Sequence, residues 1–191
     1  MKVTTTDMIQ IILTILSILV AIWIPVKIKW EQQYSSLMDS YRSMDYAIAY
    51  QGIVEFFVNE CGNDVSLIPT VYKNRFVEEI TNCKGRINKE NCLHFQRRLL
   101  AQFFWQLNEC AKSFSIGKGR VARDFTNAEA KLLKILIYIG QAIENDESGL
   151  LFKDISCPDL VKSPSSLKGQ NKGLSQLYNI LKRSKRFMDA R

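Results

Sequence analysis

Two short segments combine glycine with cations in a way that suits the binding of an anion. The first, "GKGRVAR" (residues 117–123), places Lys118, Gly119, Arg120 and Arg123 just before a predicted helix start. Glycines let backbone N–H groups turn toward a ligand, the cations neutralise its charge, and the next helix adds the positive end of its dipole. A phosphate group suits these three features, although a solvated turn is the ordinary alternative.

The second segment, "KGQNKG" (residues 168–173), repeats this combination with Lys168, Asn171 and Lys172. Its amide side chains are able to read base edges or sugar hydroxyls. Neither segment is a Walker motif, because the chain has no G-x-x-x-x-G-K-[ST] string. If the two segments meet in space they form one positive pocket, and their cations and Asn171 are the predicted ligand-binding residues.

The net charge of +7 is unevenly distributed along the chain, and this pattern also favours an anionic partner. Residues 84–134 carry 11 Lys and Arg against 4 acids, and residues 162–191 carry 8 against 1. The acidic stretch 135–161 separates them. Long nucleic acid and the anionic leaflet of a membrane are rival partners for such clusters, because both present rows of phosphates.

The residues needed for catalysis or for a metal centre are missing from the sequence pattern. His94 is the only histidine, and Cys92 lies two positions before it. In a helix those two side chains point away from each other. The sequence has no CxxC or HxxxH pair, and its carboxylates are scattered. We therefore expect no enzyme, no metal and no cofactor.

The residues from Met8 to Val26, "MIQIILTILSILVAIWIPV", form a run of 19 without a charge. A helix of this length matches a hydrocarbon core of about 30 Å. Bulky residues end the run, which favours an uncleaved single-pass anchor over a signal peptide. Lys27 and Lys29 follow the run and only Lys2 precedes it, so the C-terminal domain is predicted to be cytosolic, at the inner (cytoplasmic) membrane. An odd number of cysteines without regular spacing also suits a reducing compartment.

One face of the predicted span carries its least apolar residues, which are Gln10, Thr14, Ser17 and Ala21. Small and polar residues on one face favour helix packing in lipid or the lining of a watery passage. In the alternative, Thr14 and Ser17 bond back to their own helix and Gln10 sits near the interface. Both interpretations remain open.

Beyond the span, six positions repeat with heptad spacing and predict a helical stalk, and Pro25 between span and stalk favours a kink or swivel. The seam consists of Trp30, Tyr34, Leu37, Tyr41, Met44 and Ile48. Either a second copy of the chain or the protein's own domain could cover this seam.

The pattern therefore predicts an all-α fold with an anchor at 1–29, a stalk at 30–50 and a small basic helical domain at 51–191. Within the domain, helices are expected at 47–61, 69–83, 88–114, 126–144 and 174–188, the fourth opened by a capping box at Thr126. The stretch 145–173 reads as a loop or flap, and "LLFKDI" (150–155) is the one tempting short strand.

The membrane part "MIQIILTILSILVAIWIPVKIKW", together with the basic segments "GKGR" and "KGQNKG", resembles the small membrane effectors of type III CRISPR antiviral defence. This resemblance implies a homo-tetramer whose cytosolic domains bind cyclic tetra-adenylate and whose membrane helices then rearrange to permeabilise the bilayer. The leading hypothesis is therefore a ligand-gated membrane effector. The alternative is a membrane-tethered adaptor that binds a protein or nucleic acid and has no gating role.

Overall fold

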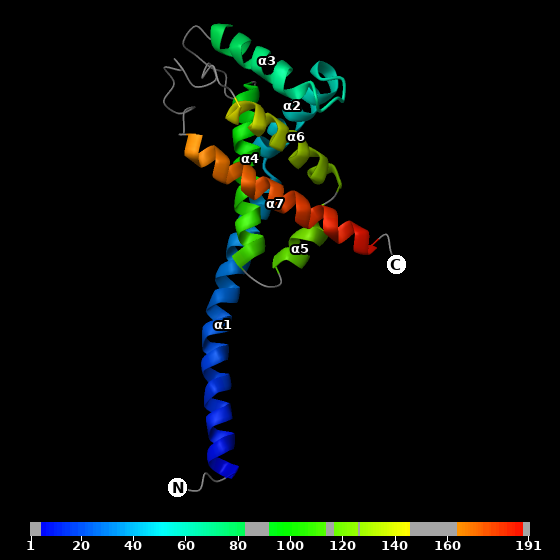
Figure 1. Ribbon diagram of the computed structural model, residues 1–191. Helices are drawn as coiled ribbons and strands as arrows, with labels where there is room; N and C mark the ends of the chain where they lie inside the picture. Colours follow the sequence, from blue (N-terminus) through cyan, green and yellow to red (C-terminus); the bar gives the residue numbers. More distant parts are fainter. Residues whose placement is uncertain (1–4, 83–91, 114–116, 126, 146–163, 189–191) are drawn as a thin grey trace.

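The computed structural model describes residues 5–82, 92–113, 117–125, 127–145 and 164–188, and it describes their side chains except at 5–7, 80–82, 164–168 and 184–188. All of the regular elements in these residues are helical, so the predicted all-α fold is confirmed (Figure 1). The elements are α1 (Thr5–Tyr41), α2 (Met44–Glu55), the π-helical η1 (Phe56–Glu60), α3 (Ile68–Asn82), α4 (Leu93–Ser113), α5 (Gly117–Asp124), α6 (Asn127–Glu144) and α7 (Pro164–Met188).

Helix α1 projects from the rest of the molecule and carries the apolar run (Figure 1). Every side chain from Met8 to Val26 is exposed, so none of the other residues that the structure describes covers this stretch. The helix is long and apolar enough to cross a membrane. Pro25 lies inside it, and the helix continues beyond Pro25 to Tyr41 as one element.

The C-terminal third of α1 packs on the protein's own domain. Trp30, Tyr34 and Leu37 are buried, and α1 contacts α4 along this segment. The sequence left open whether a second copy of the chain or the protein's own domain packs on the seam. For Trp30, Tyr34 and Leu37 it is the protein's own domain. The seam does not continue in the same helix, because α1 ends at Tyr41 and Ser43 caps a new helix whose first residue, Met44, is exposed.

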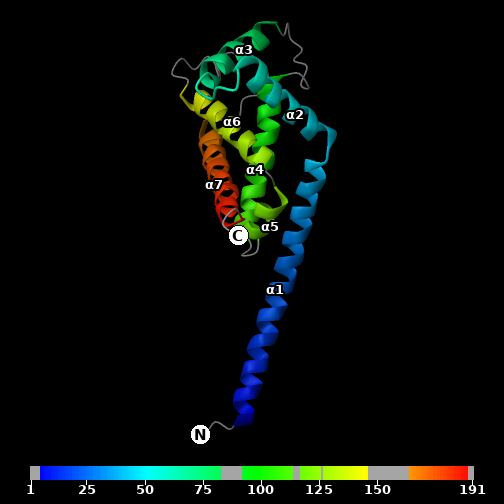
Figure 2. The ribbon, with the colours of Figure 1, turned by 90° about the vertical axis from the view of Figure 1, so that its right-hand side faces the viewer.

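The core of the domain is built around α4, which contacts α1, α2, α5 and α7 (Figure 2). Helix α6 packs on α7 and on α3, so it closes the side of the bundle opposite α1. A helix at the centre must be apolar on most of its surface. The buried face of α4 accordingly includes Leu100, Ala101, Phe104, Leu107 and Ala111, all with no exposed surface.

Helix boundaries follow local signals where those signals exist. Pro69 stands in the first turn of α3, as predicted, and Gly62 takes a left-handed φ of 57° just after η1. Thr126 lies outside the described residues, so its capping box stays a prediction. "LLFKDI" lies outside them too.

The clearest error in the predicted elements concerns α7. It begins at Pro164, ten residues before the predicted start at Leu174, so the loop prediction is wrong for residues 164–173. Proline suits the first helical position because its missing N–H has no partner there. Residues 146–163, the remainder of the predicted flap, lie outside the described residues.

Candidate functional site

The segment "GKGR" is the first turn of α5, so its prediction as a glycine-rich turn is wrong. Gly117 is buried where α5 starts against the end of α4, and a Cβ there would lie 2.8 Å from the Cys110 carbonyl oxygen. Glycine at this position therefore permits close packing of two backbones. Gly119, by contrast, faces open space, with no atom within 4 Å of an added Cβ.

These two glycines should respond to alanine in opposite directions. Gly117→Ala is expected to lower the free energy of unfolding by about 1–3 kcal/mol, because the new Cβ meets backbone that cannot rotate away. Gly119→Ala is expected to raise it by up to about 1 kcal/mol, because alanine is the better helix former. Denaturant unfolding of the full chain in detergent, followed by circular dichroism, measures both. Destabilisation by Gly119→Ala would contradict the helical assignment.

One cation of α5, Arg120, is held against α1. The Arg120 guanidinium carbon lies 4.7 Å from the centroid of the Tyr34 ring and 5.5 Å from that of Trp30. Arg120 Nε is 3.8 Å and Arg123 Nε is 3.2 Å from an Asp124 carboxylate oxygen. Arg120 is thus engaged within the protein, whereas Arg123 and Lys118 project from an exposed face.

Three hydrogen bonds tie the C-terminal part of α1 to the domain. Trp30 Nε1 donates to the Cys110 carbonyl oxygen at 2.8 Å, and the Tyr34 hydroxyl donates to Asp124 at 2.7 Å. About two turns beyond Tyr34, the Tyr41 hydroxyl donates to Glu129 at 2.8 Å. Burial, followed by the hydrogen bond to Glu129, raises the pKa of Tyr41 to about 12, so this hydroxyl keeps its proton at neutral pH.

The segment "KGQNKG" also lies within a helix, α7, so its prediction as a turn is wrong. Asn171 is buried, and its Oδ1 accepts a hydrogen bond of 3.1 Å from Arg97 Nη2. Gly140 of α6 leaves the room that the Asn171 side chain occupies. Gly173 does the same for Trp105 of α4, because a Cβ at Gly173 would lie 2.8 Å from the indole.

Asn171 therefore belongs to the core: its Oδ1 is bonded to Arg97, and its Nδ2 is buried without a hydrogen-bond partner among the described residues. Arg97 is 1% exposed, and burial lowers the pKa of its guanidinium, while the Tyr72 hydroxyl and Glu144 act in the opposite direction. Lys172 is exposed on α7, and the side chain of Lys168 lies outside the described residues.

The structure brings α5 and α7, which carry the two basic segments, into contact. Two grooves on the domain surface have other linings. Because residues 146–163 between α6 and α7 lie outside the described residues, a shared pocket stays a prediction.

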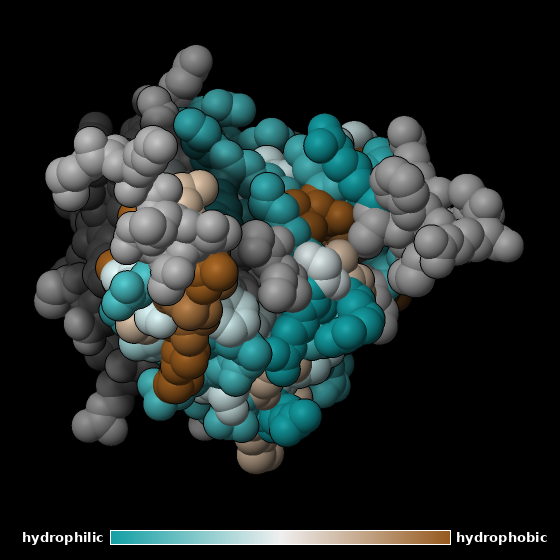
Figure 3. Space-filling view, turned by 90° about the horizontal axis from the view of Figure 1, so that it is seen from below, coloured by the Kyte–Doolittle hydropathy of each residue, from teal (hydrophilic) through white to brown (hydrophobic). Residues whose placement is uncertain are grey.

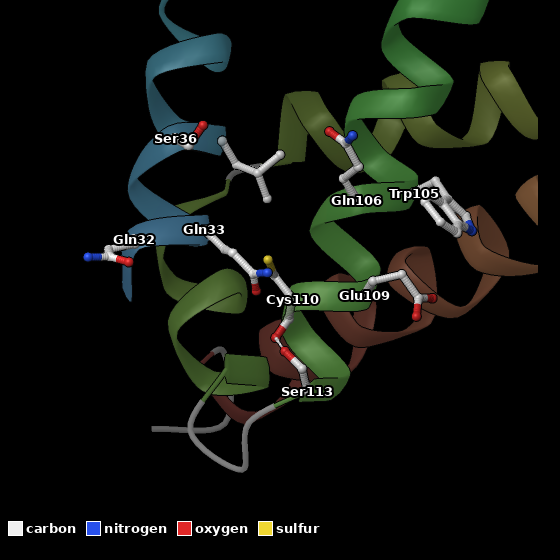
Figure 4. A pocket seen from close by; sticks show the side chains of 9 residues that line it. Gln32, Gln33, Ser36, Trp105, Gln106, Glu109, Cys110 and Ser113 are labelled. Carbon is white, nitrogen blue, oxygen red and sulfur yellow. Dashed lines mark hydrogen bonds between the residues drawn. The ribbon is translucent and has the colours of Figure 1, made fainter. Parts of the chain in front are cut away.

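The larger of the two grooves has a volume of about 600 Å³ and lies between α1 and α4 (Figure 4). Gln33 reaches from α1 toward Cys110, while Trp105 and Glu109 extend from α4 on the side away from α1. Its lining consists of Gln32, Gln33, Ser36, Leu37, Trp105, Gln106, Glu109, Cys110 and Ser113. The residues recur at helical spacing on both walls, so the groove presents two rows of side chains that mix amide, hydroxyl and carboxylate groups with apolar surface, and Trp105, 38% exposed, lies at one edge.

Sequence reasoning missed this groove. The only signal in the sequence was the position of Gln32, Gln33 and Ser36 beside the buried seam of α1, which is where the edges of a helix interface lie. The second groove, lined by Pro69, Lys73, Tyr138 and Gln141 among others, joins α3 to α6 and carried no signal in the sequence.

The polar stripe of the predicted span follows the interpretation in which its hydroxyls are satisfied locally. Thr14 Oγ1 donates to the Gln10 carbonyl oxygen at 2.8 Å, and Ser17 Oγ donates to that of Leu13 at 2.9 Å.

Gln10 in the polar stripe and Trp30 in the buried seam are 20 positions apart, which is about five and a half turns, so they lie on opposite faces of α1. The stripe therefore faces away from the domain, and self-association through Gln10, Thr14, Ser17 and Ala21 would place the domains outside the helix cluster.

The only histidine has a structural partner. His94 is buried, its Nδ1 lies 2.8 Å from the Tyr72 hydroxyl, and its ring packs on Phe76.

Nearby, Glu79 accepts hydrogen bonds from the Leu93 N–H at 3.1 Å and the Cys92 thiol at 3.4 Å, which caps α4. Burial raises the pKa of Cys92 to about 11, so this thiol is a poor nucleophile. Within the described residues, no cluster of three or more His, Cys, Asp or Glu is arranged to hold a metal.

Comparison with protein families, with curated proteins and with solved structures finds no match to this chain. The functional inference therefore depends on the contacts described above.

Proposed function

We propose that the chain is a single-pass membrane protein that acts as a non-enzymatic binding module, an adaptor held at the membrane surface. The apolar part of α1 spans the bilayer, and the helical domain lies on the cytoplasmic side. Three features support this topology: 19 consecutive exposed side chains before Lys27, the excess of cations after the span, and buried cysteines that carry free thiols.

The observation that carries the proposal is the continuity of α1 from the apolar run into the core of the domain. Trp30 and Tyr34 stack with ring centroids 5.1 Å apart, and both donate hydrogen bonds to the domain. A linker would let the domain move freely above the membrane, whereas this packed helix holds it at one height and in one orientation. A module with a fixed pose is suited to presenting a surface to a partner in or on the same membrane.

The groove between α1 and α4 is the surface that this pose presents. Its first wall residue, Gln32, lies six positions beyond Val26, or about 9 Å along the helix, so the groove opens just above the bilayer. Two rows of side chains at helical spacing fit a third helix of mixed polarity, with the amides of Gln32, Gln33 and Gln106 for its polar positions and Leu37 for an apolar one. The partner we propose is therefore the juxtamembrane helix of another membrane protein.

A ligand-gated effector of the cyclic tetra-adenylate class is the second candidate, and the same continuity of α1 favours it. Any rearrangement of the domain would reach the membrane helix without a flexible joint between them. Lys118, Arg123 and Lys172 are exposed and available to such a ligand. It ranks second because Asn171, one of the predicted ligand-binding residues, is buried and accepts a hydrogen bond from Arg97 within the core.

Leakage from dye-loaded liposomes separates the two candidates. The full chain is reconstituted and cyclic tetra-adenylate is added at micromolar concentration. An adaptor leaves the liposomes as tight as liposomes without ligand. Ligand-dependent leakage, lost when Lys118 and Arg123 are changed to alanine, would instead establish the effector.

The groove itself is tested by photo-crosslinking in cells. A photoreactive residue at Gln106 is expected to give one discrete protein adduct, whereas the same residue at Gln141, in the second groove, is the matched control and gives none. Ser36→Arg, which fills the groove, should abolish the Gln106 adduct without changing the amount of membrane-bound protein. An adduct that survives Ser36→Arg would exclude the groove as the binding site.

A further inference from the structure

A set of cations surrounds the point at which α1 leaves the domain. Lys27 and Lys29 follow the apolar run on α1, Lys112 lies in the last turn of α4, and α5 supplies three more cations. We call this set the juxtamembrane cationic surface. It consists of Lys27, Lys29, Lys112, Lys118, Arg120 and Arg123.

Contacts with Trp30 place these elements at one level. The Trp30 indole bonds to Cys110, two residues before Lys112, and the Arg120 guanidinium lies over the same indole. Both ribbon views show α5 at the end of the domain from which the anchor leaves (Figures 1 and 2). The C-terminal part of α7, with exposed Lys182 and Arg183, reaches the same end.

That level corresponds to the headgroup layer of a bilayer. Trp30 comes four residues after Val26, which is about 6 Å along a helix. The headgroup layer occupies about 5–8 Å on each side of the hydrocarbon core. A domain packed beside Trp30 therefore holds its cations among or directly above the phosphates.

The surface keeps a positive excess after its own acids are counted. Six cations face three acids, Glu31, Glu109 and Asp124, each of which lies within 4.0 Å of one or two of the cations. Such exposed pairs are weak and do not withdraw a cation from a nearby phosphate. Seen along the anchor, hydrophilic residues of the domain lie beside the apolar side chains of α1 (Figure 3).

We propose that the juxtamembrane cationic surface binds anionic phospholipid headgroups and seats the domain on the leaflet. This inference rests on the proposed membrane anchoring. The occupant is a lipid because the anchor already holds these cations at the depth of the lipid phosphates, whereas a soluble nucleic acid would have to enter the gap between domain and bilayer. Binding seats the domain because α5 is fixed to α1 through Arg120 and Asp124.

The test measures which lipids accompany the full chain. The protein is purified in dodecyl maltoside with equal amounts of phosphatidylglycerol and phosphatidylcholine, and the lipids that co-elute on gel filtration are quantified by mass spectrometry. Wild type is expected to enrich phosphatidylglycerol about three- to tenfold, since each cation near the surface attracts anionic lipid. Lys118→Glu/Arg123→Glu reverses two exposed cations and should return the ratio to about one.

A matched variant separates this surface from net charge. Lys73→Glu/Lys134→Glu makes the same change in charge beside Tyr138, at the second groove of the domain, and should keep the enrichment. Equal loss in both variants, or retention in Lys118→Glu/Arg123→Glu, would overturn the proposal. So would removal of the enrichment by millimolar inorganic phosphate or by a short single-stranded RNA, because the surface would then bind soluble anions.

Vesicle flotation distinguishes failure of this inference from failure of the anchoring. Each variant is reconstituted into phosphatidylcholine vesicles and washed with alkaline carbonate. A chain that is washed off contradicts the membrane span itself. A chain that floats but shows no lipid preference contradicts only the lipid-binding surface.

Discussion

Trp30→Ala is expected to lower the free energy of unfolding by about 3–5 kcal/mol, the range for truncation of a large buried aromatic. Trp30 is 5% exposed, and its indole supports three contacts at once: the ring of Tyr34, the guanidinium of Arg120 and the carbonyl of Cys110. Its removal leaves a cavity between α1, α4 and α5, because Cys110 belongs to α4 and Arg120 to α5. Denaturant unfolding of the full chain in detergent micelles gives the measurement.

The same helix contains a matched control for Trp30. Trp23 is 48% exposed in the apolar run, so Trp23→Ala should change the unfolding free energy by no more than about 0.5 kcal/mol. Trp30→Phe keeps the buried ring but loses the hydrogen bond, and is expected to cost about 1 kcal/mol. Equal effects of Trp23→Ala and Trp30→Ala would refute the packing of α1 on the domain.

Gly140→Ala is expected to lower the unfolding free energy by about 2–4 kcal/mol, although alanine is usually the better residue in a helix. A Cβ at Gly140 would come within 2.2 Å of Asn171 Oδ1, so the Asn171 side chain would have to turn away from Arg97. The buried guanidinium would then lose a charge-assisted hydrogen bond, and such bonds contribute about 1.5–3 kcal/mol. Thermal and denaturant unfolding both report the loss.

A double-mutant cycle isolates the cause of the Gly140 effect. In an Asn171→Ala background there is no amide to displace, so Gly140→Ala should be neutral or stabilise the chain by up to about 1 kcal/mol. The reversal of sign between the two backgrounds is the decisive result. If Gly140→Ala is equally harmful in both, the clash with Asn171 is not its cause.

The errors about glycine share one physical origin. Sequence interpretation placed Gly117, Gly119, Gly169 and Gly173 in turns that expose backbone N–H groups. Two of them, Gly117 and Gly173, instead lie where helices approach closely, because the absence of a side chain accommodates a neighbour in either situation. A local pattern does not distinguish a tight turn from a tight helix crossing, since the neighbour that decides lies elsewhere in the chain.

The seam of α1 also shows that a local pattern does not identify the contacting partner. Heptad spacing correctly marked Trp30, Tyr34 and Leu37 as residues that need a partner, but spacing does not identify the partner. That partner is α4, which begins only at Leu93, more than 50 residues after the end of α1. The groove beside the seam was equally invisible, because it exists only once α1 and α4 lie together.

From the sequence alone follow the helical class, the long apolar segment and most helix positions, because these depend on periodicity and on capping residues within a few positions. The tertiary structure decided which faces meet: Trp30 with Cys110, Arg97 with Asn171, and Arg120 with the aromatic rings of α1. These pairs are separated by about 75 to 90 positions, so no local signal specifies them. These contacts place Asn171, a predicted ligand residue, in the core and hold Arg120, another one, against α1. They also bring the cations of α5 to the end of the domain from which α1 leaves.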